Sequence, residues 1–283
     1  MTAEQAPVPA IPLDQRRGPF PGCLDADLIR RYAAATGDPN ARAINGDAVP
    51  AVAVVTQVWD ALLAGREAIA ADVERTMAGG VHGEHDIVLH RPLAPGEPLQ
   101  TWVSGWSARP VGRNALVTLR YETRDARDDL VAEQWWTTVY LGTTCAPTGP
   151  DVADHRFPDD ARSRPLGDYV VTIDEKMPLR YAEVSGDWSP HHFDVEAARQ
   201  SGFDRPFLHG LCTMALCSQG VVSIAAGGDP DRIRRLAVRF ASPAWVGEDV
   251  TVNLFDAGPG VVAFEAGSAG TPVITHGRAE LRG

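Results

Sequence analysis

Two segments with apolar residues at helical spacing are each followed by a short motif that contains Gly-Asp. Asp25–Thr36 carries Leu28, Tyr32 and Ala35 on one helical face, and Met177–Val184 is also typical of a helix. The motif GDPN follows the first segment, and SGDWSP follows the second. We therefore predict two helices that each end just before an Asp-containing loop.

A second, more apolar segment follows each of these motifs. Val49–Leu63 and Pro206–Ala225 are largely apolar, and Pro206 suits the first turn of a helix. A helix that is apolar on all sides packs inside a protein. We therefore expect two buried helices, one in each half of the chain.

Strands close each half. The segments in question alternate polar and apolar residues or are rich in β-branched residues, as strands are. They are Asp86–Leu89, Gln100–Ser107, Ala115–Thr123, Leu130–Leu141, Leu236–Ala241, Asp249–Phe255, Val261–Ala266 and Pro272–Leu281. A strand end, a proline turn and a Gly-Glu pair recur at 90–97 and 240–248. The repeated order predicts an α+β architecture in which a long apolar helix is wrapped by an antiparallel sheet, twice over.

A polar segment separates the two halves. Cys145–Leu166 is rich in Pro and Asp and has no sustained apolar period. We expect an N-terminal arm at 1–20, a first half at 21–145, a linker at 146–166 and a second half at 167–283.

Composition and charge narrow the class of protein. Hydrophobic residues make up 44% of the chain and charged residues 22%, as in ordinary soluble globular proteins. The net charge is −11, and because general polyanion binding needs a basic surface, we expect no nucleic-acid partner.

Cysteine usage and the N-terminus bear on the compartment. The four cysteines, Cys23, Cys145, Cys212 and Cys217, form no CxxC pair, and we expect them to be reduced thiols. The N-terminus lacks the apolar core of a signal peptide, and no run approaches the length of a membrane span. These features predict a cytoplasmic protein with no membrane partner.

The loop after the helix at 177–184 carries the first candidate chemistry. Asp187 and His192 lie five residues apart, with Pro190 between them. Such a loop can direct both side chains into one cavity, where a carboxylate and an imidazole can exchange protons with one water. The plain alternative is a loop cap and a surface histidine.

The start of the second apolar helix carries another candidate. His209-Gly210 lies near its N-terminus, where backbone N–H groups lack helical partners and the helix dipole favours negative charge. Glycine also allows a ligand to approach the backbone closely. This arrangement suits a thioester carbonyl whose oxygen gains negative charge, while a glycine needed only for packing is the alternative.

These motifs together resemble the signature of the MaoC-like dehydratase, or (R)-specific enoyl-CoA hydratase, family. That signature is roughly Y-x-x-x-S-G-D-x-N-P-[LI]-H-x-D-P-x-x-A, followed by F-x-x-P-[IV]-x-H-G-M. The matching residues are Tyr181, Ser185, Gly186, Asp187, Pro190, His192, Asp194, Ala197, Phe203, Pro206, His209 and Gly210. The resemblance implies a double hotdog fold and reversible hydration of a 2-enoyl thioester to an (R)-3-hydroxyacyl thioester of coenzyme A or acyl carrier protein. It implies no cofactor.

The resemblance also assigns roles to individual residues. The family's catalytic Asp and His fall on Asp187 and His192, its oxyanion amide falls on Gly210, and a serine that bonds around the site falls on Ser218. A helix-interior serine bonded to its own turn is the alternative for Ser218.

Four further residues are expected to contact substrate. Ser189 and His209 lie within the matched motifs. Arg235 and Arg239 belong to a basic cluster that would meet the phosphates of coenzyme A or an acidic carrier protein, although a solvated basic face is equally consistent.

The chain departs from the signature at several positions. Ser189 replaces the family's Asn, and a hydroxyl offers fewer hydrogen bonds than an amide. His191 and Val195 replace its Leu and Pro. In the first half, Ala43 stands where the histidine would be, and no His-Gly precedes Val49–Leu63. We therefore expect the first half to be non-catalytic, and the resemblance implies that it holds the acyl chain.

Other interpretations remain open from the sequence. The histidine spacings HxxH at 82–85 and HHxD at 191–194 lack further ligands in register, so we expect no metal. A non-catalytic acyl-binding subunit, or a biosynthetic enzyme that uses the same pair on an unusual acyl substrate, are the alternative functions. A homodimer is a further expectation.

Overall fold

Ten strands form one antiparallel sheet in the computed structural model, which describes residues 13, 15–69 and 80–283. The first half contributes β1 (Arg16–Cys23), β2 (Gly80–Leu89), β3 (Pro98–Val111), β4 (Asn114–Asp125) and β5 (Leu130–Tyr140). The second half contributes β6 (Pro165–Thr172), β7 (Ile233–Phe240), β8 (Asp249–Asp256), β9 (Val261–Ser268) and β10 (Thr271–Leu281). The eight predicted strands are all present, and β1 and β6 are additional.

The strand order shows the duplication. It runs β1-β3-β4-β5-β2-β7-β10-β9-β8-β6, so it has the same connectivity when followed inward from either edge. The halves meet where β2 pairs with β7, with Glu84 opposite Arg239 and Val88 opposite Arg235. One hydrophobic cluster extends through both halves, so they share a core.

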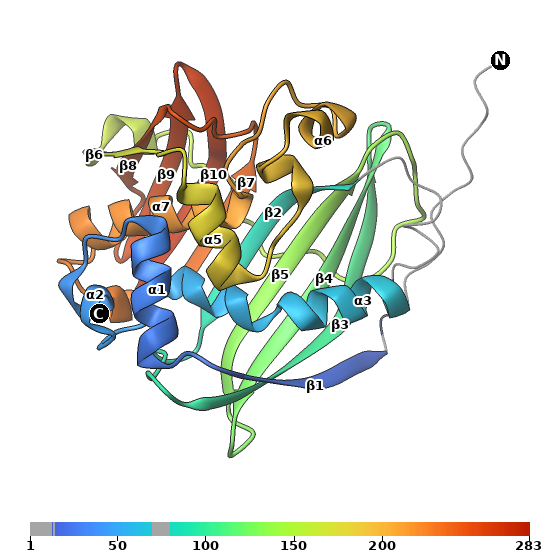
Figure 1. Cartoon of the computed structure of the whole chain (residues 1–283), viewed down its shortest axis with the longest axis horizontal. Coiled ribbons are helices and arrows are strands. Elements are labelled where there is room, and N and C mark those ends of the chain that lie inside the picture. The colour runs from blue at the N-terminus through green and yellow to red at the C-terminus, as the bar shows by residue number, and fades with distance from the viewer. Residues whose placement is uncertain (1–12, 14, 70–79) are drawn as a thin grey trace.

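The helices cover one side of this sheet (Figure 1). The first half has α1 (Ala26–Thr36), α2 (Ala41–Asn45), the 3₁₀ turn η1 (Ala51–Gln57) and α3 (Trp59–Ile69). The second half has α5 (Met177–Ser185), η3 (Pro190–His192), α6 (Val195–Gln200) and α7 (Gly210–Ile224), with short turns η2 (Ala161–Ser163) and η4 (Pro230–Arg232). Among the described residues, none of these helices combines the length and apolarity that crossing a membrane requires.

Both predicted buried helices are shorter than expected. Val49–Leu63 divides into η1 and α3, because the β-branched run Val52–Thr56 is a poor α-helix former and follows Pro50. Helix α7 begins at Gly210 rather than at Pro206. The residues just before it are extended, and the Leu208 amide donates to the carbonyl of Ala244 at 2.9 Å.

The segment between the halves crosses the other side of the sheet. His155 Nδ1 bonds to the carbonyl of His276 at 2.7 Å, and Phe157 packs with Ala161 against Ala263. The last residues of the expected linker, from Pro165, already belong to β6. Similarly, the expected arm at 1–20 ends in strand structure, because β1 begins at Arg16 and pairs with β3.

Candidate active site

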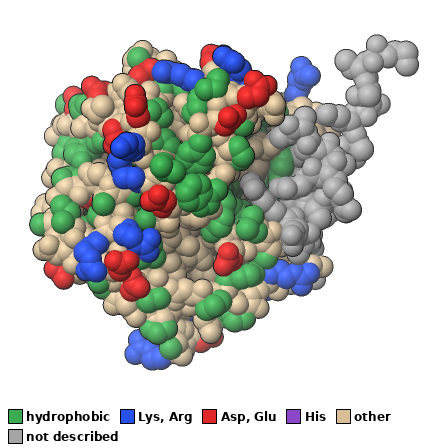
Figure 2. All heavy atoms as spheres, viewed as in Figure 1, with side chains coloured by type: hydrophobic (Ala, Val, Ile, Leu, Met, Phe, Trp, Pro, Cys, Tyr) green, Lys and Arg blue, Asp and Glu red, His purple; other side chains and the backbone are tan. Residues whose placement is uncertain are grey.

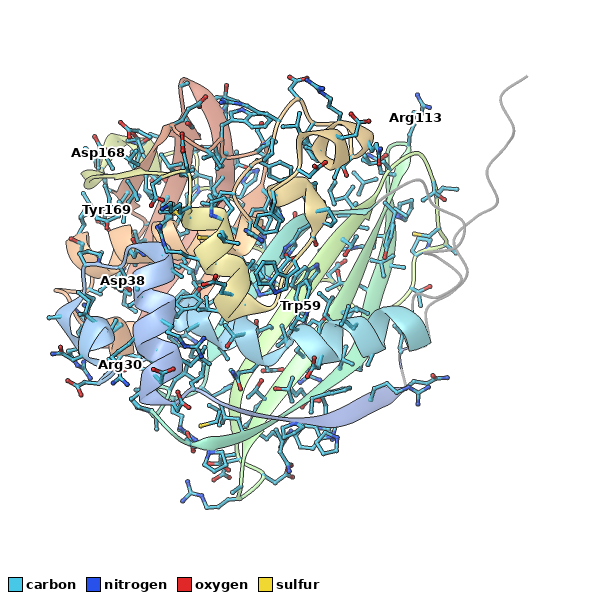
Figure 3. All side chains as sticks on the ribbon, viewed as in Figure 1. Arg30, Asp38, Trp59, Arg113, Asp168 and Tyr169 are labelled. Carbon is cyan, nitrogen blue, oxygen red and sulfur yellow. The ribbon has the colours of Figure 1, made fainter. Side chains whose placement is uncertain are left out.

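A tight loop between α5 and η3 presents Asp187 and His192. Helix α5 ends at Gly186, whose φ of 80° is left-handed and therefore suits glycine. Trp59, at the start of α3, lies beside this glycine, 3.2 Å from where a Cβ would be, so the first half supports the loop (Figure 3). Pro190 then opens the turn that carries His192 inward.

Ser189 holds the Asp187 carboxylate. Asp187 Oδ1 accepts from the backbone amide of Ser189 at 3.1 Å and from its hydroxyl at 2.6 Å. Both bonds use Oδ1, so Oδ2 remains for water or substrate among the residues that the structure describes. Ser189 therefore contacts the Asp187 carboxylate, which is a different role from the expected substrate contact.

His192 is fixed as a neutral base. Its Nδ1 lies 2.8 Å from the carbonyl oxygen of Phe207. A carbonyl can only accept, so Nδ1 carries the proton and Nε2 has a free lone pair. Burial, together with the nearby imidazoles of His209 and His191, lowers the pKa of His192 to about 2.

His209 contacts both Asp187 and His192. Its Nε2 donates to the backbone carbonyl of Asp187 at 3.0 Å. Its ring stacks on that of His192, with 3.7 Å between the ring centroids. Burial lowers the pKa of His209, which favours the neutral ring beside His192. These contacts point to positioning of the loop, whereas the sequence suggested contact with substrate.

Gly210 begins α7 next to these residues. Its amide belongs to the first turn, where no helical acceptor is available. A Cβ at this position would meet the ring of Phe240 at 3.2 Å, so packing also requires a glycine here. The backbone role and the packing role are therefore compatible.

A cavity of about 670 Å³ opens over His192. Its lining residues are Glu175, Pro178, Leu179, Trp188, His192, Phe193, Arg205, Pro206 and Val246. Trp188 and Phe193 are 54% and 36% exposed at its rim. Hydrophobic side chains gather in the middle of the face that carries α5 (Figure 2). A mainly apolar cavity with a few convergent polar groups is typical of a small-molecule site.

Comparisons with known proteins identify the family. A profile described as MaoC like domain matches residues 160–274. The chain is 32% identical over 200 residues to 3-hydroxyacyl-thioester dehydratase Y of Mycobacterium tuberculosis. The matched region covers 68% of this chain and 67% of that protein. The chain belongs to the MaoC-like dehydratase family.

Two further comparisons concern a second relative in sequence and the fold. Enoyl-CoA hydratase 2 of Arabidopsis thaliana is 24% identical over 216 residues, which cover 72% of this chain and 68% of that protein. The crystal structure of a MaoC-like dehydratase from Phytophthora capsici superposes with a TM-score of 0.82 at 21% identity, over 95% of this chain and 97% of that one. The likeness to solved structures confirms the predicted double hotdog fold.

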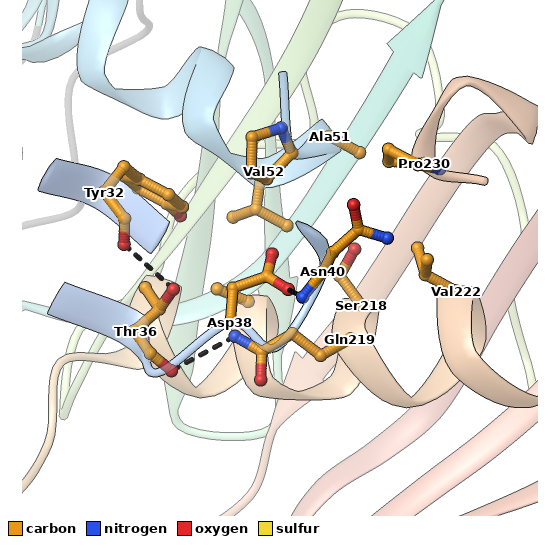
Figure 4. A pocket seen from close by; sticks show the side chains of 12 residues that line it. Tyr32, Thr36, Asp38, Asn40, Ala51, Val52, Ser218, Gln219, Val222 and Pro230 are labelled. Atoms are coloured by element: carbon orange, nitrogen blue, oxygen red, sulfur yellow. Dashed lines mark hydrogen bonds between the residues drawn. The ribbon is translucent and has the colours of Figure 1, made fainter. Parts of the chain in front are cut away.

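Ser218 lies away from the catalytic pair of this MaoC-like chain. It is eight residues beyond Gly210, which is a rise of about 12 Å along α7. It lines a cavity of about 10 Å³ with Thr36, Asp38, Asn40 and other residues of the first half, as Figure 4 shows. That volume holds about one water and no acyl chain. The structure therefore does not bring Ser218 together with Asp187 and His192.

The same cavity shows what the first half has kept of a MaoC-like site. Asp38 occupies the place of Asp187 in the repeated motif, and its Oδ1 accepts from the Asn40 amide at 2.9 Å. No histidine lines the cavity, and Ala43 is fully buried in α2. Gln219 closes the cavity by donating to the carbonyl of Thr36 at 3.1 Å. At this cavity the first half thus has the carboxylate of Asp38 but no histidine that corresponds to His192.

The two candidate arginines lie on the opposite side of the sheet from Gly210. Phe240 packs under Gly210, and because side chains alternate along a strand, Arg239 points the other way. Arg235 is 9% exposed and bonds to Asp86 at 2.7 Å and Glu280 at 3.3 Å. Arg239 pairs with Glu84 at 2.7 Å. The ion pairs with Asp86 and Glu84 join the two halves, and neither guanidinium lines the cavity over His192.

Phe207 and Trp188 are site residues that the sequence did not single out. Phe207 acts through a backbone carbonyl, which no side-chain pattern reveals. Trp188 occupies the variable position of the Gly-Asp-x motif, and an aromatic residue there, next to the catalytic Asp, was the available signal.

Proposed function

We propose that Asp187 and His192 catalyse reversible hydration of a 2-enoyl thioester to a 3-hydroxyacyl thioester. The observation that carries this proposal is the proximity of two hydrogen-bond acceptors, because ligand atoms of Asp187 and His192 lie within 4.8 Å of each other. Asp187 has a carboxylate oxygen to spare, and His192 has a bare Nε2. A water between them can donate one hydrogen bond to each. As its oxygen attacks the β-carbon, one of these two protons passes to the pair and the other stays on the new hydroxyl.

The charge that develops in this step needs a separate partner. As the water oxygen bonds to the β-carbon, electron density moves through the α-carbon to the thioester oxygen. The Gly210 amide, at the positive end of α7, stabilises that enolate. The proton taken from the water by the pair then passes to the α-carbon. Because one pair serves both carbons, we expect syn addition. The likeness to the (R)-specific hydratase family implies that the product is the (R)-3-hydroxyacyl thioester.

Deuterium incorporation tests the reaction and its geometry together. Crotonyl-CoA hydrated in D₂O should give (R)-3-hydroxybutyryl-CoA with one deuterium at the α-carbon, on the face that receives the oxygen. Tight binding of crotonyl-CoA without loss of the enone absorbance would instead favour an acyl-binding subunit. Deuterium on the opposite face would contradict the proposed geometry.

A metal is not part of this proposal. Ligand atoms of Asp187, His192 and His209 lie within 4.8 Å of one another, a spacing that a metal site also uses. The hydrogen bonds from His192 Nδ1 and His209 Nε2 to carbonyls suit a water-based pair without a cation. Turnover should survive dialysis against EDTA, and a loss that zinc restores would contradict this.

The finer assignments belong to the same proposal. We take the substrate to be a thioester of coenzyme A or acyl carrier protein, with phosphopantetheine only as part of the substrate. We also propose a cytoplasmic location, and a homodimer that analytical ultracentrifugation can test.

A further inference from the structure

A cluster of aromatic and polar side chains adjoins Gly210 on the helix side of the sheet. The ring of Phe240 lies under Gly210 and is 4.7 Å from the ring of His82. His82 in turn stacks on Trp136 at 3.8 Å and lies 5.2 Å from His85. Phe240 and His82 are only partly buried, whereas His85 and Trp136 are buried. The cluster therefore continues inward from the site of the thioester carbonyl.

The hydrogen bonds around His85 fix its tautomer. Its Nε2 lies 3.1 Å from Gln134 Oε1, and Gln134 Nε2 donates to the carbonyl of Val54 at 3.3 Å. Gln134 Oε1 must then accept, so His85 Nε2 carries the proton and Nδ1 has the lone pair. Burial lowers the pKa of His85 to about 4, which keeps the ring neutral near pH 7. Nδ1 has no donor among the residues that the structure describes.

Trp136 offers the complementary group. It stands opposite His85 on the neighbouring strand, with 5.5 Å between the ring centroids and 84° between the planes. Its indole Nε1–H can only donate, and this buried atom has no acceptor within the described part of the chain. Each buried unpaired group costs about 1–3 kcal/mol, and natural proteins keep few of them.

We propose that His85 and Trp136 bind a hydroxyl group on the acyl tail of the thioester. A hydroxyl can donate to His85 Nδ1 and accept from Trp136 Nε1–H at the same time. A keto or ether oxygen only accepts and would leave His85 unpaired, and a methylene would leave both groups unpaired. This hydroxyl differs from the one formed at the β-carbon, which arises between Asp187 and His192. The inference rests on the proposed function and names its preferred substrates as tail-hydroxylated acyl thioesters.

The wild-type protein tests the proposal directly. The substrates are trans-2-decenoyl-CoA and a series of the same thioester with one hydroxyl at successive carbons of the tail. At one position the hydroxyl should raise kcat/KM by about tenfold, the equivalent of roughly 1.4 kcal/mol. If no position exceeds the plain chain, the two groups hold only a structural water and the proposal is overturned.

Two substitutions locate the preference. His85→Phe and Trp136→Phe keep aromatic bulk and remove the polar atoms, so each should abolish the hydroxyl preference. Trp135→Phe is the matched control, because Trp135 points to the opposite side of the sheet and its substitution should leave the preference intact.

The outcomes separate this proposal from the proposed function. Hydration of crotonyl-CoA without any hydroxyl preference overturns the hydroxyl site alone, as does a preference that survives both His85→Phe and Trp136→Phe. Failure to hydrate any enoyl thioester overturns the proposed function and this inference with it. If a variant does not fold, the wild-type substrate series still decides.

Discussion

His192 donates its Nδ1 proton to the carbonyl of Phe207 across 2.8 Å. This bond holds the ring and leaves Nε2 unprotonated at the catalytic cavity. Nδ1 therefore positions the ring, and Nε2 is the atom that can accept a proton. Substitutions can separate these two roles.

His192→Asn should remove the chemistry and keep the fold. An Asn amide can replace the Nδ1 donor toward Phe207, but nothing replaces the Nε2 acceptor. We expect kcat on crotonyl-CoA to fall by ~10²–10⁴ with little change in the thermal midpoint. A variant with near wild-type kcat would show that Nε2 plays no part in proton transfer.

His209→Gln and His209→Phe should differ in activity. Gln can place an amide N–H near the position of Nε2 and keep the bond to the Asp187 carbonyl, whereas Phe keeps only the stacking on His192. We expect kcat to fall by about tenfold in His209→Phe and to recover in His209→Gln, with KM less affected, as for a positioning residue. Equal losses in the two variants, carried by KM, would favour substrate contact instead.

Ser218→Ala should leave catalysis unchanged. Ser218 lines the small cavity around Asp38, about 12 Å along α7 from Gly210. We expect kcat within about twofold of wild type, and a change in unfolding free energy of up to roughly 1 kcal/mol for a buried hydroxyl. A drop in kcat comparable to that of His192→Asn would return Ser218 to the catalytic set.

The sequence predicted the elements that carry local signals. Strand alternation identified eight strands. The Gly-Asp loop brings ligand atoms of Asp187 and His192 within 4.8 Å of each other, because Gly186 and Pro190 determine the local backbone. Edge strands β1 and β6 were not predicted, since both contain prolines and β6 begins inside a segment of linker composition.

Long-range relationships were not predictable in the same way. Arg235 and Arg239 looked available to a ligand because their partners, Asp86 and Glu84, lie about 150 positions earlier in the chain. Ser218 looked catalytic because its spacing from Gly210 matches the family. Only the packing of α7 against the first half shows that Ser218 faces the cavity around Asp38.

Stability should fall as the pH drops below 7, in part through His85. Its pKa in the fold, about 4, is below the ordinary 6.5 of the unfolded chain. The unfolded chain therefore takes up the proton first, and the contribution of this group is complete above pH 6.5 and lost as pH falls toward 4.

Urea unfolding at pH 7 and pH 5 measures this contribution. Wild type should lose about 2 kcal/mol more than His85→Phe between these two values. Trp135→Phe, which removes no titratable group, is the control and should lose as much as wild type. An equal loss in wild type and His85→Phe would show that His85 is not buried in its neutral form.

Turnover by Asp187→Asn tests the central claim most directly. The amide keeps the size of the side chain and, through its oxygen, the bonds from Ser189, but it has no carboxylate to take a proton. With crotonyl-CoA as substrate and loss of the enone absorbance as readout, we predict that kcat falls by ~10²–10⁴ while the thioester still binds. Near wild-type turnover by Asp187→Asn would contradict the assignment of the Asp187–His192 pair.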